Sequence, residues 1–290
     1  MSRGIGNSVV PPVYDGRMFP VPTSLSPSRV ESFLSCPLAF RFASIEKLPE
    51  PPSVHTTRGS LVHRALELLF MRAAAGRTIE TAIVALGEAI EEYRTDPDFV
   101  DLHLTDTEAE VFFDECLQLV HGYFRMEDPQ AICEIGLELR LEAPVGDLTL
   151  RGIIDRLELD ADGELVVTDY KTGRAPGANW EQKSLSGVHF YSFLCEALFG
   201  RRPAKIRLMY LKTGETIEAT PSAQSVRFVT TRTQAVLKAV EKACTTGSFQ
   251  ARPSSLCNSC AFKQWCPAFG GTPDLAAVEA PRSFGPAVAA

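Results

Sequence analysis

The sequence lacks the features that carry a chain into or across a membrane. Its opening residues, MSRGIGNSVVPPVYDGRMFPVP, contain no continuous apolar segment like the core of a signal peptide. No apolar run approaches the roughly 20 residues that a membrane-spanning helix needs. We therefore expect a cytoplasmic protein with no membrane partner.

The 290 residues also lack internal repeats, low-complexity tracts and a Gly-x4-Gly-Lys-Ser/Thr phosphate loop. These absences argue against a repeat architecture and against a helicase motor within this sequence. The contents of 45% hydrophobic and 22% charged residues are those of an ordinary globular protein. A net charge of −7 argues only weakly against nucleic-acid binding, because net charge ignores local patches.

Eight cysteines without an export signal favour reduced thiols and metal ligands over a disulfide framework. Cys257, Cys260 and Cys266 follow the spacing Cys-x2-Cys-x5-Cys in SLCNSCAFKQWCP. A tetrahedral metal or cluster site needs four ligands, so one must lie elsewhere. No thioredoxin-like βαβ pattern surrounds the first pair, which weakens a direct redox role. The remaining cysteines are interpreted as small core residues: Cys116, Cys133, Cys195 and Cys244.

The first half of the chain has the patterns of helices. Ser26 and Pro27 predict the start of one helix, and Cys36-Pro37 the boundary between that helix and the next. Further helices are expected over 58–76 (capped by Ser60 and ended by Gly76), over 78–94, and from the capping box Thr105-x-x-Glu108.

The second half changes character. Short alternating or apolar runs over 132–144, 148–159 and 164–173 predict three strands of an antiparallel meander. A helix over 180–200, a strand over 204–214 and a helix over 222–245 follow. The pattern predicts an α/β domain whose sheet carries an N-terminal helical insertion.

An acidic pair and a lysine lie on adjacent predicted strands. Asp169 and Lys171 are two residues apart in VVTDYKTG, so both project from one side of the strand and Tyr170 from the other. Asp155, in GIIDR, and Asp169 are each seven residues from Asp162 in the turn. If the hairpin closes symmetrically there, their Cβ atoms are about 5 Å apart. A one-residue slip in register would separate them.

Two carboxylates beside an ammonium group suit phosphodiester hydrolysis assisted by Mg²⁺ or Mn²⁺. The ion would polarise a phosphate oxygen and lower the pKa of its bound water. Lys171 would orient that water and offset charge in the transition state. The alternative is that each carboxylate caps a turn or pairs with a surface cation, as most acidic residues do.

This arrangement resembles the core of the PD-(D/E)XK nucleases, in which an aspartate precedes the motif (Asp/Glu)-x-Lys. The segment RGSLVHRALE, with His63 on a predicted helix, resembles the helix histidine of the RecB-like branch. The resemblance covers about residues 24–268. It implies a restriction-endonuclease-like fold, with a mixed sheet core flanked by helices.

The resemblance also implies roles for individual residues. His63, Asp155, Asp169 and the Tyr170 carbonyl would be metal ligands, and Asp155, Asp169 and Lys171 would be catalytic. From its position on a helix alone, His63 is more readily a core histidine beside apolar neighbours. The family's Gln-x3-Tyr pair is incomplete in this sequence, which has Tyr191 but Gly187 four residues earlier. Gln182 is too distant to replace the glutamine, and His189 is a candidate substitute for it in binding substrate.

The iron–sulfur subset of RecB-like nucleases has one cysteine before the nuclease core and three after it. By this resemblance Cys36 is the fourth ligand, together with Cys257, Cys260 and Cys266, of a structural [4Fe-4S] cluster. Four thiolates would satisfy Zn²⁺ equally well, so zinc stays an alternative.

The resemblance thus implies a Mg²⁺- or Mn²⁺-dependent DNA exonuclease that acts on single-stranded ends in repair or recombination, alone or beside a separate helicase. The alternative is a cluster-bearing DNA-binding or assembly subunit whose nuclease site is vestigial. We expect a disordered tail (1–22), a helical region (23–130), a nuclease core (131–250), a cysteine-cluster segment (251–269) and a second disordered tail (270–290).

Overall fold

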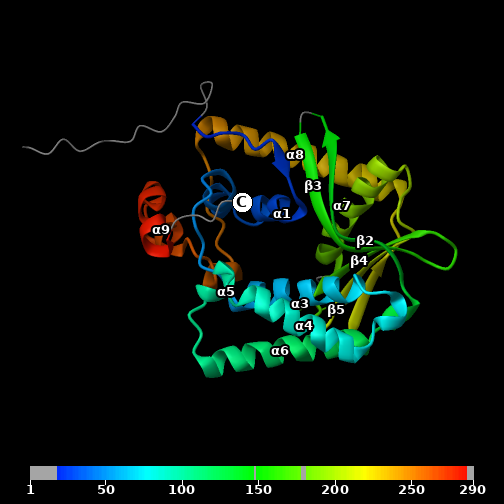
Figure 1. Ribbon diagram of the computed structural model, residues 1–290. Helices are drawn as coiled ribbons and strands as arrows, with labels where there is room; N and C mark the ends of the chain where they lie inside the picture. The colour runs from blue at the N-terminus through cyan, green and yellow to red at the C-terminus, as the bar shows by residue number, and fades with distance from the viewer. Residues whose placement is uncertain (1–17, 147, 178–180, 286–290) are drawn as a thin grey trace, which may run out of the picture. The chain divides into compact units, whose positions relative to one another are not determined.

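The computed structural model describes residues 18–146, 148–177 and 181–285, with the backbone alone for 181–188 (Figure 1). The predicted tail over 1–22 therefore falls mostly outside the described residues. The chain forms two compact units. We call the unit that contains residues 24–28 and 50–233 the sheet unit, and the unit built from the remaining segments the terminal unit.

A six-stranded mixed sheet organises the sheet unit, in the order β1-β3-β4-β5-β6 with β2 also paired to β3. β1–β3 and β4–β5 are parallel and the other pairs antiparallel. The bounds are Ser24–Leu25 (β1), Cys133–Val145 (β2), Leu148–Leu159 (β3), Leu165–Lys171 (β4), Lys205–Tyr210 (β5) and Glu215–Ala219 (β6). The predicted meander is confirmed as β2-β3-β4. The short β1 and the polar β6 have no clear strand pattern in the sequence.

The register between β3 and β4 is the one predicted from the symmetric turn. Leu159 pairs with Leu165, and the ladder runs to Arg156 and Thr168. The next position along the ladder would bring Asp155 opposite Asp169. The β3–β4 pairing stops before that position, while β4 continues beside β5 to Lys171. The two acidic residues thus lie where β3 and β4 part.

Three helices of the sheet unit pack together: α3 (Val54–Phe70), α4 (Ile79–Tyr93) and α6 (Asp106–Phe124), with the short α5 (Pro97–Val100) between α4 and α6 in sequence (Figure 1). Their shared core includes Tyr170, Met209 and Leu211 from the sheet side. The capping box at Thr105 is confirmed, since Glu108 N–H donates to its hydroxyl at 3.3 Å. The predicted cap of α3 was wrong. Ser53 caps that helix instead, accepting from Thr56 N–H at 3.1 Å.

Helix α7 (Glu181–Phe199) packs on β2 and β3. A Cβ on Gly152 of β3 would lie 2.8 Å from Leu194 Cδ1 and 3.6 Å from Tyr191 Cε1. The first distance is too short for a real contact, so any larger residue here would force the Leu194 side chain to move. Gly152 therefore permits the close approach that brings Tyr191 near β4.

The terminal unit is built from both ends of the chain. Its elements include most of α1 (Pro27–Ser35), then α2 (Pro37–Phe40), the π-helical turn η1 (Arg41–Ile45), the later part of α8 (Ala223–Thr246) and α9 (Ala276–Phe284), with short 3₁₀ turns between α8 and α9. Phe42 packs against Phe262 with ring centroids 5.1 Å apart. None of the helices described is both long and apolar enough to cross a membrane.

The structure differs from the prediction of a disordered tail over 270–290. Residues up to 284 form a 3₁₀ turn, Pro273–Leu275, and then α9. Trp265 anchors this helix, because its Nε1 donates to Glu279 at 2.7 Å and its ring meets Phe284 edge-on. The sequence hides this packing because the segment is rich in Ala, Gly and Pro.

Candidate active site and cysteine pocket

A candidate metal centre forms where β3 and β4 part. Beyond the last β3–β4 pair, the Tyr170 N–H donates to Asp155 Oδ2 at 2.7 Å. Nε2 of His63, from α3, lies 3.0 Å from the Tyr170 carbonyl oxygen, and its Nδ1 lies 3.6 Å from Asp155 Oδ2. The parting of the strands thus gathers a carboxylate, an imidazole and a carbonyl, all of which are metal-ligating groups.

Glu138 completes this group and was not predicted from the sequence. One ligand atom from each of His63, Glu138 and Asp155 lies within 4.8 Å of the others. Glu138 has φ of +42°, a left-handed conformation uncommon outside glycine. Backbone strain of this kind concentrates at functional sites. A signal was present, because Gly146-Asp147 predicts a two-residue hairpin turn that would place Glu138 opposite Asp155.

Asp169 belongs to a second cluster beside the first. Lys171 Nζ lies 2.5 Å from Asp169 Oδ2, and the Tyr191 hydroxyl donates to Asp169 Oδ1 at 3.1 Å. Asp169 is not one of the three residues whose ligand atoms lie within 4.8 Å of one another. The proposed roles of Asp155 and Asp169 therefore involve different neighbours.

Tyr191 and His189 have different surroundings. The Tyr191 hydroxyl bonds to Asp169, whereas His189 Nδ1 is buried and has no hydrogen-bond partner among the described residues. Two residues on a helix are about 200° apart, so both cannot face one site. His189 thus has no contact in support of its predicted substrate role. The side chains of 181–188, including Gln182, lie outside the described residues.

Charges within the site shift the protonation equilibria of its members. Burial and the negative charge of Asp169 raise the pKa of Asp155. Burial, helped by the charge of Asp155, raises the pKa of Glu138 to about 7. Burial lowers the pKa of His63, which favours the neutral imidazole that metals bind. A divalent cation would offset this crowding of negative charge and displace the protons.

Lys171 retains its proton. Burial lowers its pKa, but the negative charge of Asp169 and the hydrogen bond between them outweigh that effect and raise it. The Lys171 side chain is 43% exposed, whereas that of Asp169 is 7% exposed. The ammonium group is therefore charged and accessible to a substrate.

A buried arginine supports the site from the opposite side of the strands. Arg156 is fully buried and forms ion pairs with Glu127 and Glu158. Its Nη1 donates to the Tyr170 hydroxyl at 2.8 Å. Arg156 and Tyr170, which directly follow the two site aspartates in sequence, therefore belong to one hydrogen-bond network. Nη2 adds a bond to Thr168 at 3.3 Å. This network ties β3 and β4 to the segment just after α6, behind the acidic group.

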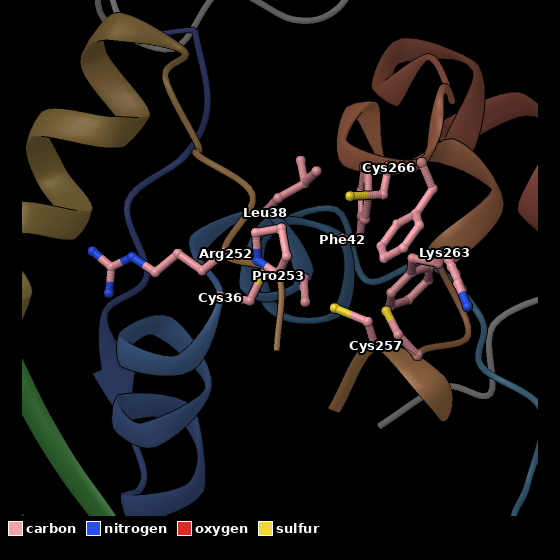
Figure 2. A pocket seen from close by; sticks show the side chains of 12 residues that line it. Cys36, Leu38, Phe42, Arg252, Pro253, Cys257, Lys263 and Cys266 are labelled. Atoms are coloured by element: carbon pink, nitrogen blue, oxygen red, sulfur yellow. The ribbon is translucent and has the colours of Figure 1, made fainter. Parts of the chain in front are cut away.

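Four cysteines line one pocket of the terminal unit: Cys36, Cys257, Cys260 and Cys266. In Figure 2, Cys36 approaches from one side and Cys257 and Cys266 from the other. Leu38, Phe42 and Phe269 also line the pocket. The predicted gathering of Cys36 with the downstream cysteines is thus present. Burial, with the nearby thiols, raises the pKa of Cys260.

The other cysteines lie apart from this pocket. Cys116, Cys195 and Cys244 are buried, as predicted for core residues. Cys133 is exposed, so its assignment to the core was wrong. It begins β2 at the end of the strand, where its side chain has little to pack against.

A family model for the PD-(D/E)XK nuclease superfamily matches residues 24–267. The chain belongs to this superfamily. Membership agrees with the mixed sheet flanked by helices, and it confirms the predicted fold class and the family resemblance. It also supports nuclease activity.

This nuclease-superfamily chain is 28% identical over 175 residues to a protein of Streptococcus equi subsp. zooepidemicus, the B subunit of an ATP-dependent helicase/deoxyribonuclease. The match covers 57% of this chain and 16% of the relative. Among solved structures, the crystal structure of SSO0001 matches with a TM-score of 0.40 and 14% identity, covering 85% of this chain and 86% of that one.

Proposed function

We propose that this protein is a metal-dependent deoxyribonuclease, acting as an exonuclease on single-stranded ends. The observation that carries the proposal is the group formed by His63, Glu138 and Asp155, with the Asp169–Lys171 pair beside it. Members of a nuclease superfamily could retain the fold without the chemistry, but the acidic residues and lysine of the motif are all present here.

The residues fit a divalent cation. Its ligands would come from His63, Glu138, Asp155, Asp169 and the Tyr170 carbonyl, a set of mainly oxygen donors suited to Mg²⁺ or Mn²⁺. A bound ion supplies a Lewis acid that polarises a phosphate oxygen and lowers the pKa of its water.

The chain supplies the rest of the chemistry. Asp169 holds the charged Lys171 ammonium beside the metal ligands, where it orients the attacking water and offsets negative charge as the phosphorus centre gains a fifth oxygen. Tyr191 fixes the other oxygen of Asp169, so the carboxylate presents a constant orientation.

The relative's name is consistent with a helicase partner. That relative is one subunit of a helicase/deoxyribonuclease, and this chain matches 16% of it. The sequence contains no Gly-x4-Gly-Lys-Ser/Thr loop. We therefore propose that strand separation, where needed in repair or recombination, is provided by a separate helicase.

Digestion of DNA strands labelled at the 5′ or the 3′ end tests the proposed activity. With Mg²⁺ or Mn²⁺, a single-stranded substrate should be shortened progressively from one end, and EDTA should stop the reaction. Circular single strands distinguish the modes, because an exonuclease leaves them intact. DNA binding without cleavage in either metal would favour the alternative, a cluster-bearing subunit with a vestigial nuclease site.

We further propose that the four-cysteine pocket holds a structural [4Fe-4S] cluster. Four thiolates suffice for this cluster or for zinc. Sulfurs bound to one tetrahedral zinc would lie about 3.8 Å apart. No three of the four cysteines, all within the described residues, have sulfurs within 4.8 Å of one another. This wider spacing favours the larger group.

Protein purified without oxygen should contain about four irons per chain and absorb broadly near the visible–ultraviolet boundary. Cys36→Ser should lower the iron content as much as Cys257→Ser, because both remove a ligand. Cys133→Ser is the matched control, since Cys133 is exposed and outside the pocket. One zinc and no iron would exclude the cluster but leave the nuclease proposal intact. Full iron occupancy in Cys36→Ser would exclude the fourth ligand.

A further inference from the structure

A polar cavity lies in the sheet unit, and some of its lining residues are close in sequence to those of the candidate metal centre. Its volume is about 190 Å³, far above the roughly 15 Å³ that one water molecule needs. Its polar lining residues are Arg58, Glu115, Gln118, Arg125, Thr172 and Lys212. Three cations face one carboxylate, so the cavity favours an anionic group.

Arg58 is held in a fixed position in the wall of this cavity. The residue is 6% exposed, forms an ion pair with Glu115, and has Nη2 3.0 Å from His55 Nδ1. Its Nε is buried and has no hydrogen-bond partner among the residues described. Arg58 thus places a buried guanidinium with one unpaired donor in the wall of the cavity.

Arg125 and Lys212 supply the accessible positive charge. Both are exposed. Within the described ranges, neither side chain forms an ion pair. Arg125 follows the last residue of α6, and Lys212 lies in the turn between β5 and β6. Together with the amide of Gln118 and the hydroxyl of Thr172, these two cations are the kinds of donor that hold phosphate groups.

The cavity adjoins the elements that carry the proposed catalytic groups. Thr172 directly follows Lys171, about 3.3 Å further along the chain. Arg58 precedes Gly59, and a Cβ added to that glycine would lie only 3.3 Å from Thr172 Oγ1. Gly59 is itself about one helical turn before His63 on α3. The cavity and the candidate metal centre are thus both built on α3 and the end of β4.

We propose that this cavity binds a phosphate of the substrate strand next to the one being cleaved. The proposal rests on the proposed nuclease function. It adds a binding site for the DNA strand beside Lys171. Such a contact positions the strand without reading its sequence. It would also make binding salt-dependent through release of counterions from the phosphate.

The test compares strand binding by wild type and the double variant Arg125→Gln/Lys212→Gln. Both residues are exposed, so the replacements keep the fold. A fluorescent single strand is titrated in EDTA at several salt concentrations, and its anisotropy gives Kd. Loss of one phosphate contact should reduce the slope of log K against log salt by about 0.7. Kd at low salt should rise about tenfold, as for a lost charged hydrogen bond.

Arg201→Gln is the matched control. It removes one exposed cation that pairs with Glu164 near the turn before β4, at the opposite end of that strand from Thr172. Its slope and Kd should equal those of wild type. The full experiment is run on strands with a 5′-hydroxyl and with a 5′-phosphate, and the loss should be the same for both.

Three outcomes overturn the inference. If wild type cleaves DNA but the double variant binds with unchanged slope and Kd, the phosphate site is wrong and the nuclease function stands. A loss confined to the 5′-phosphorylated strand would assign the cavity to a terminal phosphate instead. If wild type neither binds nor cleaves the strand with Mn²⁺, the proposed function and this site both fail.

Discussion

Replacing Lys171 with alanine is expected to lower the rate of strand cleavage at saturating Mn²⁺ by about 10²–10³-fold, the usual cost of removing one group that stabilises charge in a transition state. The affinity for Mn²⁺ should change little, because the ammonium is not a metal ligand. Single-turnover cleavage and a Mn²⁺ titration measure the two effects separately.

Lys205→Ala is the control for Lys171→Ala. Lys205 is a partly exposed lysine at the start of β5 that pairs with Glu218, so its loss removes the same charge without touching the site. Its cleavage rate should match wild type. A well-folded Lys171→Ala protein that cleaves at the wild-type rate would remove Lys171 from the proposed chemistry.

Arg156→Met should lower the free energy of unfolding by about 3–5 kcal/mol, because it removes the buried cation from the buried Glu158 and the largely buried Glu127. Glu158 is 3% exposed, and Glu127 pairs with two nitrogens of the same guanidinium. Urea denaturation of the full chain gives the value.

Arg207→Met is the matched comparison. Arg207 also pairs with Glu158, but its side chain is 23% exposed and water screens the pair. Its replacement should cost clearly less than that of Arg156. Equal costs for the two variants would show that burial of the Arg156 network does not determine its contribution.

The sequence predicts the part of the site that depends on local turns. The symmetric turn around Asp162 predicted the β3–β4 register, and the alternation of a strand put Asp169 and Lys171 together. Glu138 could have been found in the same way from the turn at Gly146, which sets the β2–β3 register. Its left-handed conformation, in contrast, has no signal in its own segment.

Tertiary pairings are less visible in the sequence. From the sequence, Arg156 cannot be distinguished from an exposed charged strand residue, because its partner Glu127 lies 29 positions earlier in the chain. The start of α3 was misplaced because Ser53 and Ser60 both have the side chain of a helix cap. The grouping of Cys36 with three distant cysteines came from the family resemblance, since spacing along the chain does not reveal such a pairing.

The Mn²⁺ dependence of cleavage in Asp155→Asn tests the central claim most directly. Asparagine keeps an oxygen for the Tyr170 N–H but removes the negative charge, so the fold should persist. Half-maximal cleavage should need at least about 100-fold more Mn²⁺, since even the outer partners of metal ligands change affinity by 10–100-fold. Asp160→Asn, in the exposed turn, should behave as wild type. Wild-type cleavage in EDTA, or an unchanged Mn²⁺ requirement in Asp155→Asn, would contradict the proposed metal centre.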